Sequence, residues 1–134
     1  MLELFVDFRK ALFVKKFFAS LALLLGATLG LTGCSGANSV EITDDTVIID
    51  VRTPEEFQGG HLEGAINIDV QSADFAEKMM ELDPNGEYYG YCRSGTRSSQ
   101  AVAWMNQMGF NGENITNGGG FQDASKATGI PLVQ

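Results

Sequence analysis

Histidine and cysteine are scarce in this chain of 134 residues, which holds one histidine, His61, and two cysteines, Cys34 and Cys92. A single histidine leaves too few ligands for a zinc cluster, so we expect neither a metal site nor a cofactor. The chain allows one domain with some extra sequence at an end, and that domain is long enough to bury a modest core without disulfides.

Basic residues are also few, nine against seventeen acidic ones, and four of the nine lie within residues 1–33. Because residues 1–33 contain two acidic side chains, residues 34–134 carry a net charge of about −10. A domain so poor in lysine and arginine is not expected to bind nucleic acid, which requires neutralisation of phosphates. It is equally unsuited to a polybasic attachment to anionic lipid.

One uncharged, largely apolar run stands out, the 17 residues from Phe17 to Gly33, and basic residues precede it. It is at the short end of the range for spanning a bilayer, and its glycines weaken it further. A basic segment, an apolar segment and small residues before a cut site are typical of a secretory signal peptide. The alternative is a single uncleaved membrane anchor.

The end of this run, Leu31-Thr32-Gly33-Cys34, resembles the lipobox of bacterial lipoproteins and favours the signal peptide over the anchor. The resemblance implies that residues 1–33 are removed and that Cys34 receives acyl chains such as palmitate, with residues 34–40 as a tether. The protein is then expected to be exported. It is held by its lipid on the outer face of the cytoplasmic membrane or in an outer membrane facing the periplasm.

The remaining residues, 41–134, alternate between strand and helix patterns. We expect strands at residues 46–51, 65–68, 87–91 and 114–117, with a break at the glycines 118–120, and helices at residues 53–58, 72–82, 95–108 and 121–127. This order predicts an α/β domain with an open, mostly parallel sheet flanked by helices.

Cys92 is the residue with the most distinctive position, since it ends one predicted strand just before a predicted helix. Open α/β sheets bind ligands at this edge, where loop N–H groups and a helix dipole favour anions. Arg93 and Arg97 add positive charge, so we expect the pKa of Cys92 to lie below that of an ordinary thiol. If Cys34 carries lipid, Cys92 is the only free thiol, and an unpaired cysteine in an exported domain indicates reactivity.

The segment Cys92-Arg93-Ser94-Gly95-Thr96-Arg97-Ser98 resembles the active-site loop of single-domain rhodaneses. Residues 50–52, 56–57 and 60–68 resemble the upstream signature of that family, and residues 118–119 and 129–131 resemble its ending. The resemblance covers nearly all of residues 40–134. Many members have a tryptophan in the last helix, where this chain has Phe121.

The resemblance implies an enzyme, a sulfurtransferase of the thiosulfate:cyanide type, in which Cys92 is the catalytic nucleophile. The Cys92 thiolate takes the outer sulfur of thiosulfate or a similar small sulfur-containing anion, becomes a persulfide, and passes the sulfur to a thiol, cyanide or protein acceptor. The substrate-binding residues implied by the loop are Arg93, Ser94, Gly95, Thr96, Arg97 and Ser98.

Two alternatives remain open beside this reading. Related phosphatases and arsenate reductases use a loop with five residues between cysteine and arginine, whereas four separate Cys92 from Arg97. The shorter loop favours sulfur. The second alternative is a persulfide or thiol carrier without turnover, or a rhodanese-like binding module.

Several other residues are expected to be structural. His61 is predicted to make a hydrogen bond near a turn, and Asp50 and Arg52 to pair within the fold, Arg52 with Glu56. Trp104 and the methionines of its helix are expected in the core.

Overall fold

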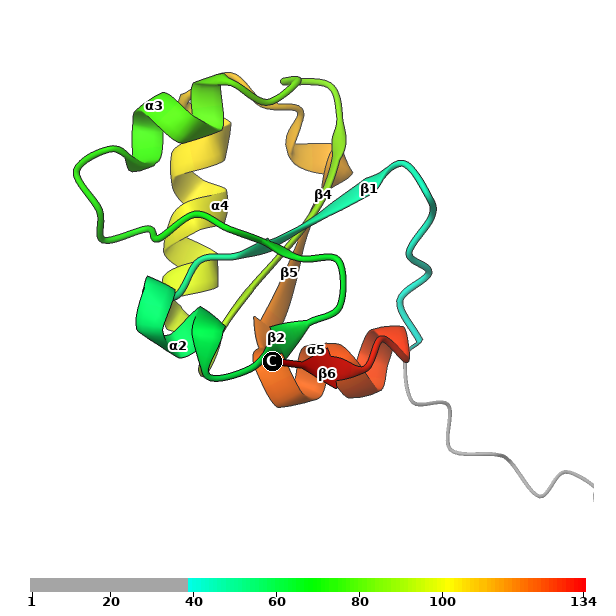
Figure 1. The fold of residues 1–134 in the computed structure, drawn as a ribbon. Coiled ribbons are helices and arrows are strands. Elements are labelled where there is room, and N and C mark those ends of the chain that lie inside the picture. Colours follow the sequence, from blue (N-terminus) through cyan, green and yellow to red (C-terminus); the bar gives the residue numbers. More distant parts are fainter. Residues whose placement is uncertain (1–38) are drawn as a thin grey trace, which may run out of the picture. The chain divides into compact units, whose positions relative to one another are not determined.

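A parallel sheet of four strands lies at the centre of the computed structural model, which describes residues 39–134 (Figure 1). The strands run in the order β3-β1-β4-β5, with bounds Ile66–Asn67, Thr46–Asp50, Glu87–Cys92 and Ile115–Gly120. Every neighbouring pair is parallel, so all carboxyl ends meet at one edge. The predicted α/β class with an open parallel sheet is confirmed.

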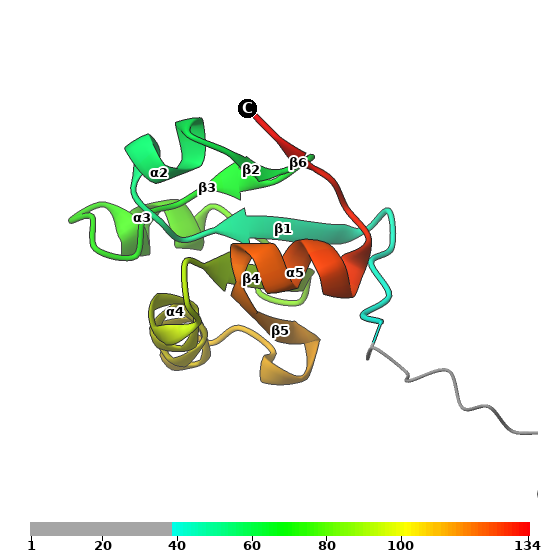
Figure 2. The same ribbon diagram turned by 90° about the horizontal axis from the view of Figure 1, so that it is seen from below.

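Helices cover both faces of this sheet (Figures 1 and 2). Their bounds are α2 Pro54–Gln58, α3 Phe75–Met80, α4 Thr96–Gln107 and α5 Phe121–Thr128, with a short 3-10 turn at Gly112–Asn114. No helix among the residues described is long and apolar enough to cross a membrane.

Alternation along the strands divides the core into two clusters, because successive side chains of a strand point to opposite faces. Ile49, Tyr88 and Cys92 face the cluster shared with α3 and α4. Ile48 and Tyr89 face the cluster shared with α5. The thiol of Cys92 thus belongs to the side of the sheet that α4 covers.

Two very short strands, β2 (His61–Leu62) and β6 (Leu132–Val133), form a second, antiparallel sheet beside α5. The sequence did not predict them, since two residues show no periodicity. Their pairing brings the end of the chain against the segment that follows α2.

Three predicted boundaries or placements are wrong. Helix α3 begins at Phe75 rather than at Ser72, whose hydroxyl instead donates to Asp74 Oδ1 at 2.5 Å. Trp104 is 42% exposed rather than in the core, and its contact with the core is an edge-on one with the ring of Phe75.

The glycines 118–120 are the third error, since they continue β5 instead of breaking it. A Cβ on Gly118 would lie 2.5 Å from the ring of Tyr89, and one on Gly120 would lie 2.9 Å from the carbonyl oxygen of Arg93. Glycine is therefore required here by close packing within a strand.

Asp50 and Arg52 form a buried ion pair, with exposed fractions of 0% and 4%. Arg52 Nη2 donates to Asp50 Oδ2 and to the carbonyl oxygen of Gly60, each at 2.6 Å, and the guanidinium lies 4.5 Å from the ring centre of Phe121. The predicted structural role is right, but the predicted partner, Glu56, is wrong. The pair ties the end of β1 to the turn before β2 and to α5.

The substitution Asp50→Asn should lower the free energy of unfolding by about 3–5 kcal/mol, because it leaves the Arg52 charge buried without a counter-charge. Urea unfolding followed by circular dichroism measures this. Asp74→Asn is the matched control, since the Asp74–Lys78 pair is half exposed and should matter little. Equal losses in the two variants would contradict the assignment.

Candidate active site

Cys92 ends β4 and is followed by a turn of three residues, after which α4 begins at Thr96. This places the thiol at the carboxyl edge of the sheet, between the ends of β1 and β5. The residue is 1% exposed, so bulk water scarcely reaches its sulfur. The predicted position at the strand–helix junction is confirmed.

Hydrogen-bond donors of the loop converge on the Cys92 sulfur. The backbone N–H of Gly95 donates to Sγ at 3.0 Å, and the backbone N–H groups of Ser94 and Ser98 also favour the thiolate. The Ser98 hydroxyl donates to the Gly95 carbonyl oxygen in this structure and lies near enough to turn its proton to an ionised sulfur. Burial alone would raise the pKa of the thiol, but these donors outweigh it and hold the pKa below its ordinary value. The expected lowering of the Cys92 pKa is therefore present, and the loop groups are its main cause, while the charge of Arg97 also interacts with the thiolate.

Gly95 makes this geometry possible. Its φ of 99° lies in the left-handed region that other residues avoid, and this turns its N–H back towards Cys92. Its carbonyl oxygen then accepts hydrogen bonds from the Ser98 hydroxyl at 3.0 Å and the Ser99 hydroxyl at 2.8 Å. The loop is thus closed on itself around the sulfur.

The two arginines of the loop differ in whether a carboxylate pairs with them. Arg97 is held by Glu56 of α2, with Nη1 to Oε2 at 2.6 Å and Nη2 to Oε1 at 2.9 Å. Arg93 is exposed and makes no ion pair with any residue from 39 to 134. Only Arg93 therefore offers an unneutralised positive charge, where the sequence predicted two.

The remaining predicted loop residues differ in their contacts. Of the three hydroxyls, only that of Ser98 is buried and acts on the sulfur, whereas Ser94 and Thr96 are exposed. Helix α4 has no side-chain cap, so the hydroxyls of Ser94 and Thr96 do not cap it. Cys34 lies outside the described residues, as do residues 1–33.

His61 has the structural role that was predicted. Its Nδ1 lies 2.9 Å from the carbonyl oxygen of Phe57, and its ring stacks on the Phe57 ring with centroids 3.8 Å apart. Within residues 39–134 no three histidine, cysteine or acidic side chains gather as metal ligands would.

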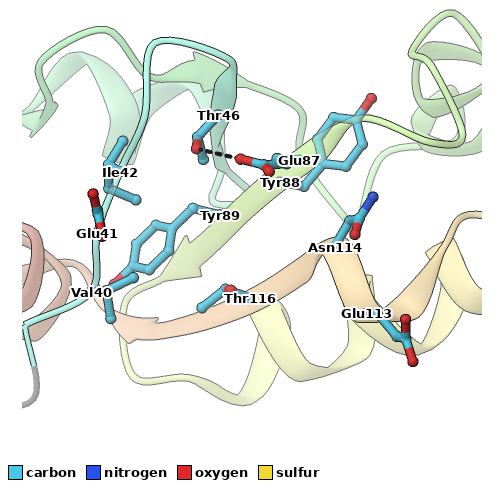
Figure 3. A pocket seen from close by; sticks show the side chains of 10 residues that line it. All are labelled: Val40, Glu41, Ile42, Thr46, Glu87, Tyr88, Tyr89, Glu113, Asn114 and Thr116. Atoms are coloured by element: carbon cyan, nitrogen blue, oxygen red, sulfur yellow. Dashed lines mark hydrogen bonds between the residues drawn. The ribbon is translucent and has the colours of Figure 1, made fainter.

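A hollow of about 210 Å³ lies at the opposite, amino edge of the sheet, where β1 and β4 begin (Figure 3). Its lining includes three glutamates, Glu41, Glu87 and Glu113, and none of the predicted site residues. Thr46 donates to Glu87 Oε2 at 3.2 Å across its wall. Three carboxylates repel anions, so this hollow does not suit the small anion expected at Cys92.

Comparison with known proteins agrees with the geometry. The rhodanese-like domain family matches residues 38–126. The chain belongs to this family. Thiosulfate sulfurtransferase PspE of Escherichia coli K12 is 36% identical over 75 residues, which are 56% of this chain and 70% of PspE.

A sulfurtransferase of Allochromatium vinosum is 32% identical over 91 residues, or 68% of this chain and 81% of the relative. The solved structure of a rhodanese with anions from E. coli aligns with a TM-score of 0.54 and 33% identity, over 66% of this chain and 98% of that one. These relatives support a sulfurtransferase of the rhodanese type.

The pKa of Cys92 should rise in a Ser98→Ala variant, because one donor to the thiolate is lost. The thiolate exists above the pKa of the folded protein and disappears as the pH falls through it, so the variant should lose its thiolate at a higher pH than the parent. Thiolate absorbance in the ultraviolet measures this. Burial raises the pKa of the phenols of Tyr88, Tyr89 and Tyr91, so their ionisation does not overlap the titration of the thiol.

Ser99→Ala is the control for this titration, since the Ser99 hydroxyl bonds to the same Gly95 carbonyl. It is not among the donors to the sulfur. A titration curve that shifts equally in both variants would mean that loop geometry, not the Ser98 donor, governs the thiol.

Proposed function

We propose that this protein is a sulfurtransferase that carries sulfane sulfur as a persulfide on Cys92. The Cys92 thiolate attacks the outer sulfur of thiosulfate or a similar donor, the donor S–S bond breaks, and sulfite leaves with the bonding electron pair. Cyanide, a thiol or a protein acceptor then removes the outer sulfur and regenerates the thiolate. The protein thus alternates between a free thiolate form and a persulfide form, as in ping-pong catalysis.

The observation that carries this proposal is the loop closed around the Cys92 sulfur, with the Gly95 N–H donating to Sγ at 3.0 Å and the Ser94 and Ser98 N–H groups favouring the thiolate. A thiolate and a persulfide both bear negative charge on sulfur, so the same donors stabilise the resting and the loaded states. The first turn of α4, a helix of 12 residues, adds its dipole to this effect.

The length of the loop argues against phosphate chemistry. Four residues between Cys92 and Arg97 form a smaller loop than the five of the related phosphatases, and the Arg97 guanidinium is occupied by Glu56. The sulfurtransferase names of the relatives add support from another direction. A carrier that is loaded but does not turn over remains the alternative.

Incubation of the protein with thiosulfate should add about 32 daltons, one sulfur atom, at Cys92, as a persulfide does. Addition of cyanide should then release thiocyanate over many cycles. Cys92→Ser should lose both signals, with turnover reduced by at least about a thousandfold because the nucleophile is gone. Mass spectrometry and a colorimetric thiocyanate assay provide the measurements.

Ser94→Ala serves as the matched control, since it alters an exposed loop hydroxyl and leaves the Ser94 N–H in place. It should retain persulfide formation. A mass gain without thiocyanate would favour the carrier, and the absence of both signals in the parent protein would refute sulfur transfer.

We further infer from the sequence that the domain works outside the cytoplasm, attached to a membrane by acyl chains on Cys34. The supports are the basic and apolar segments of residues 1–33 and the lipobox-like Leu31-Thr32-Gly33-Cys34. Two or three acyl chains suffice for stable anchoring. The acidic domain itself offers no polybasic surface to hold anionic lipid.

A Cys34→Ala variant should no longer incorporate labelled palmitate, and its signal segment should remain uncleaved. Metabolic labelling and the mass of the recovered protein measure this, with Cys92→Ala as the control that keeps its label. Persistence of the labelled, shortened form in Cys34→Ala would rule out the lipid anchor.

A further inference from the structure

Glu56 holds Arg97 in a two-point clamp that leaves neither group free. Both Nη atoms of Arg97 donate to the Glu56 carboxylate, at 2.6 and 2.9 Å, and the side chains are only 21% and 24% exposed. The Arg97 guanidinium lowers the pKa of Glu56 to about 2. Glu56 is therefore charged at every pH at which the protein would work.

The backbone prevents Glu56 from turning away. Glu56 is the third residue of α2, and its carboxylate also accepts the backbone N–H of Thr53 at 3.3 Å, while the Thr53 hydroxyl accepts the N–H of Glu56. This reciprocal capping box fixes the start of the helix. Release of Arg97 by a swing of Glu56 would also break the hydrogen bond from the Thr53 N–H, one half of the capping box.

The clamp determines which charges beside the thiol are left without a partner. Arg97 and Glu56 cancel, so the exposed Arg93 is the one loop cation without a carboxylate partner, beside the negative charges of the Cys92 thiolate and Asp69. Each negative charge on a donor is repelled by the thiolate that it must approach, so a donor with one charge meets less repulsion than a donor with two. A dianion such as thiosulfate brings a second negative charge for which the loop has no free partner.

We propose that Glu56 sets the charge of the sulfur donor: by neutralising Arg97 it shifts the preference of the loop from dianionic thiosulfate towards monoanionic donors such as organic thiosulfonates. This rests on the proposed sulfur transfer through Cys92. It assigns to a residue of α2, 36 positions before the thiol in the chain, a part in donor selection.

The chemistry of a monoanionic donor balances in the same way as that of thiosulfate. The Cys92 thiolate attacks the outer sulfur of a thiosulfonate anion, and the new S–S bond forms as the old one breaks. The electron pair of the broken bond leaves on a sulfinate anion. One negative charge enters with the donor and one departs, whereas thiosulfate brings two and releases two on sulfite.

The test compares kcat/KM for thiosulfate with kcat/KM for methanethiosulfonate anion, each with cyanide as acceptor, in the full chain. In a ping-pong reaction, kcat/KM for the donor reports the first half-reaction alone. Glu56→Gln removes the charge but keeps an acceptor for Arg97 and a residue that suits the capping box. This variant should raise the ratio of kcat/KM for thiosulfate to kcat/KM for the thiosulfonate about tenfold. Thiosulfate carries two negative charges and the thiosulfonate one, so the loss of the Glu56 charge favours thiosulfate more.

Two single-residue controls separate charge from structure. Glu55→Gln makes the same change of net charge one residue away, on an exposed side chain, and should leave the ratio unchanged. Glu56→Asp keeps the charge and should stay within about twofold of the parent ratio, since it alters distance rather than sign.

The double variant Glu56→Gln with Arg97→Gln gives the sharpest result. It removes both charges, so the net charge returns to that of the parent and the ratio should return with it, even if both rates fall. A ratio that instead drops far below the parent value would show that Arg97 binds the dianion directly, and the proposal would be overturned.

The role of Glu56 and the sulfur transfer itself can be refuted separately. A parent protein that forms persulfide from both donors, with a ratio that Glu56→Gln leaves unmoved, would overturn the role of Glu56 and leave sulfur transfer intact. A parent that forms persulfide from neither donor would overturn both. Thermal unfolding of each variant verifies that the rates compare folded proteins.

Discussion

A buried sulfur anion needs hydrogen-bond donors, and the structure around Cys92 follows from that need. Burial of the thiol opposes ionisation, so the loop must supply N–H groups within reach of Sγ. Gly95 supplies one by adopting a left-handed backbone, and α4 begins directly after it. Gly120 of β5 leaves room for the carbonyl of Arg93 on the other side. The positions of two glycines and of the start of α4 thus all contribute to the surroundings of the Cys92 sulfur.

Basic residues are few in this domain, and most of them form ion pairs with carboxylates. Of the five basic residues after Cys34, Arg52 pairs with Asp50, Lys78 with Asp74, and Arg97 with Glu56. Arg93 is thus the cation of the loop that no carboxylate neutralises. The hollow at the far edge of the sheet carries the opposite sign, through three glutamates. The loop of Cys92 and the far hollow thus differ in charge, and of the two only the loop favours an anion.

The sequence could predict whatever depends on local pattern. The strand before Cys92, the helix after it and the α/β order all follow from short-range signals and were found. The clamp between Glu56 and Arg97 could not be predicted, because the two residues lie 41 positions apart and several other carboxylates were available to Arg97. Trp104 was misplaced since helical periodicity identifies a face but not how far the neighbouring elements cover it.

The proposed cycle also constrains the second half-reaction. Cys34 is the only other cysteine of the chain, so a persulfide on Cys92 has no partner thiol in this domain and must be discharged to another molecule. The thiolate itself is enclosed, but the outer sulfur of a persulfide stands about 2 Å beyond Sγ. Discharge therefore requires an acceptor that can reach a sulfur bonded to a residue only 1% exposed, which favours a small nucleophile or a thiol on a slender side chain.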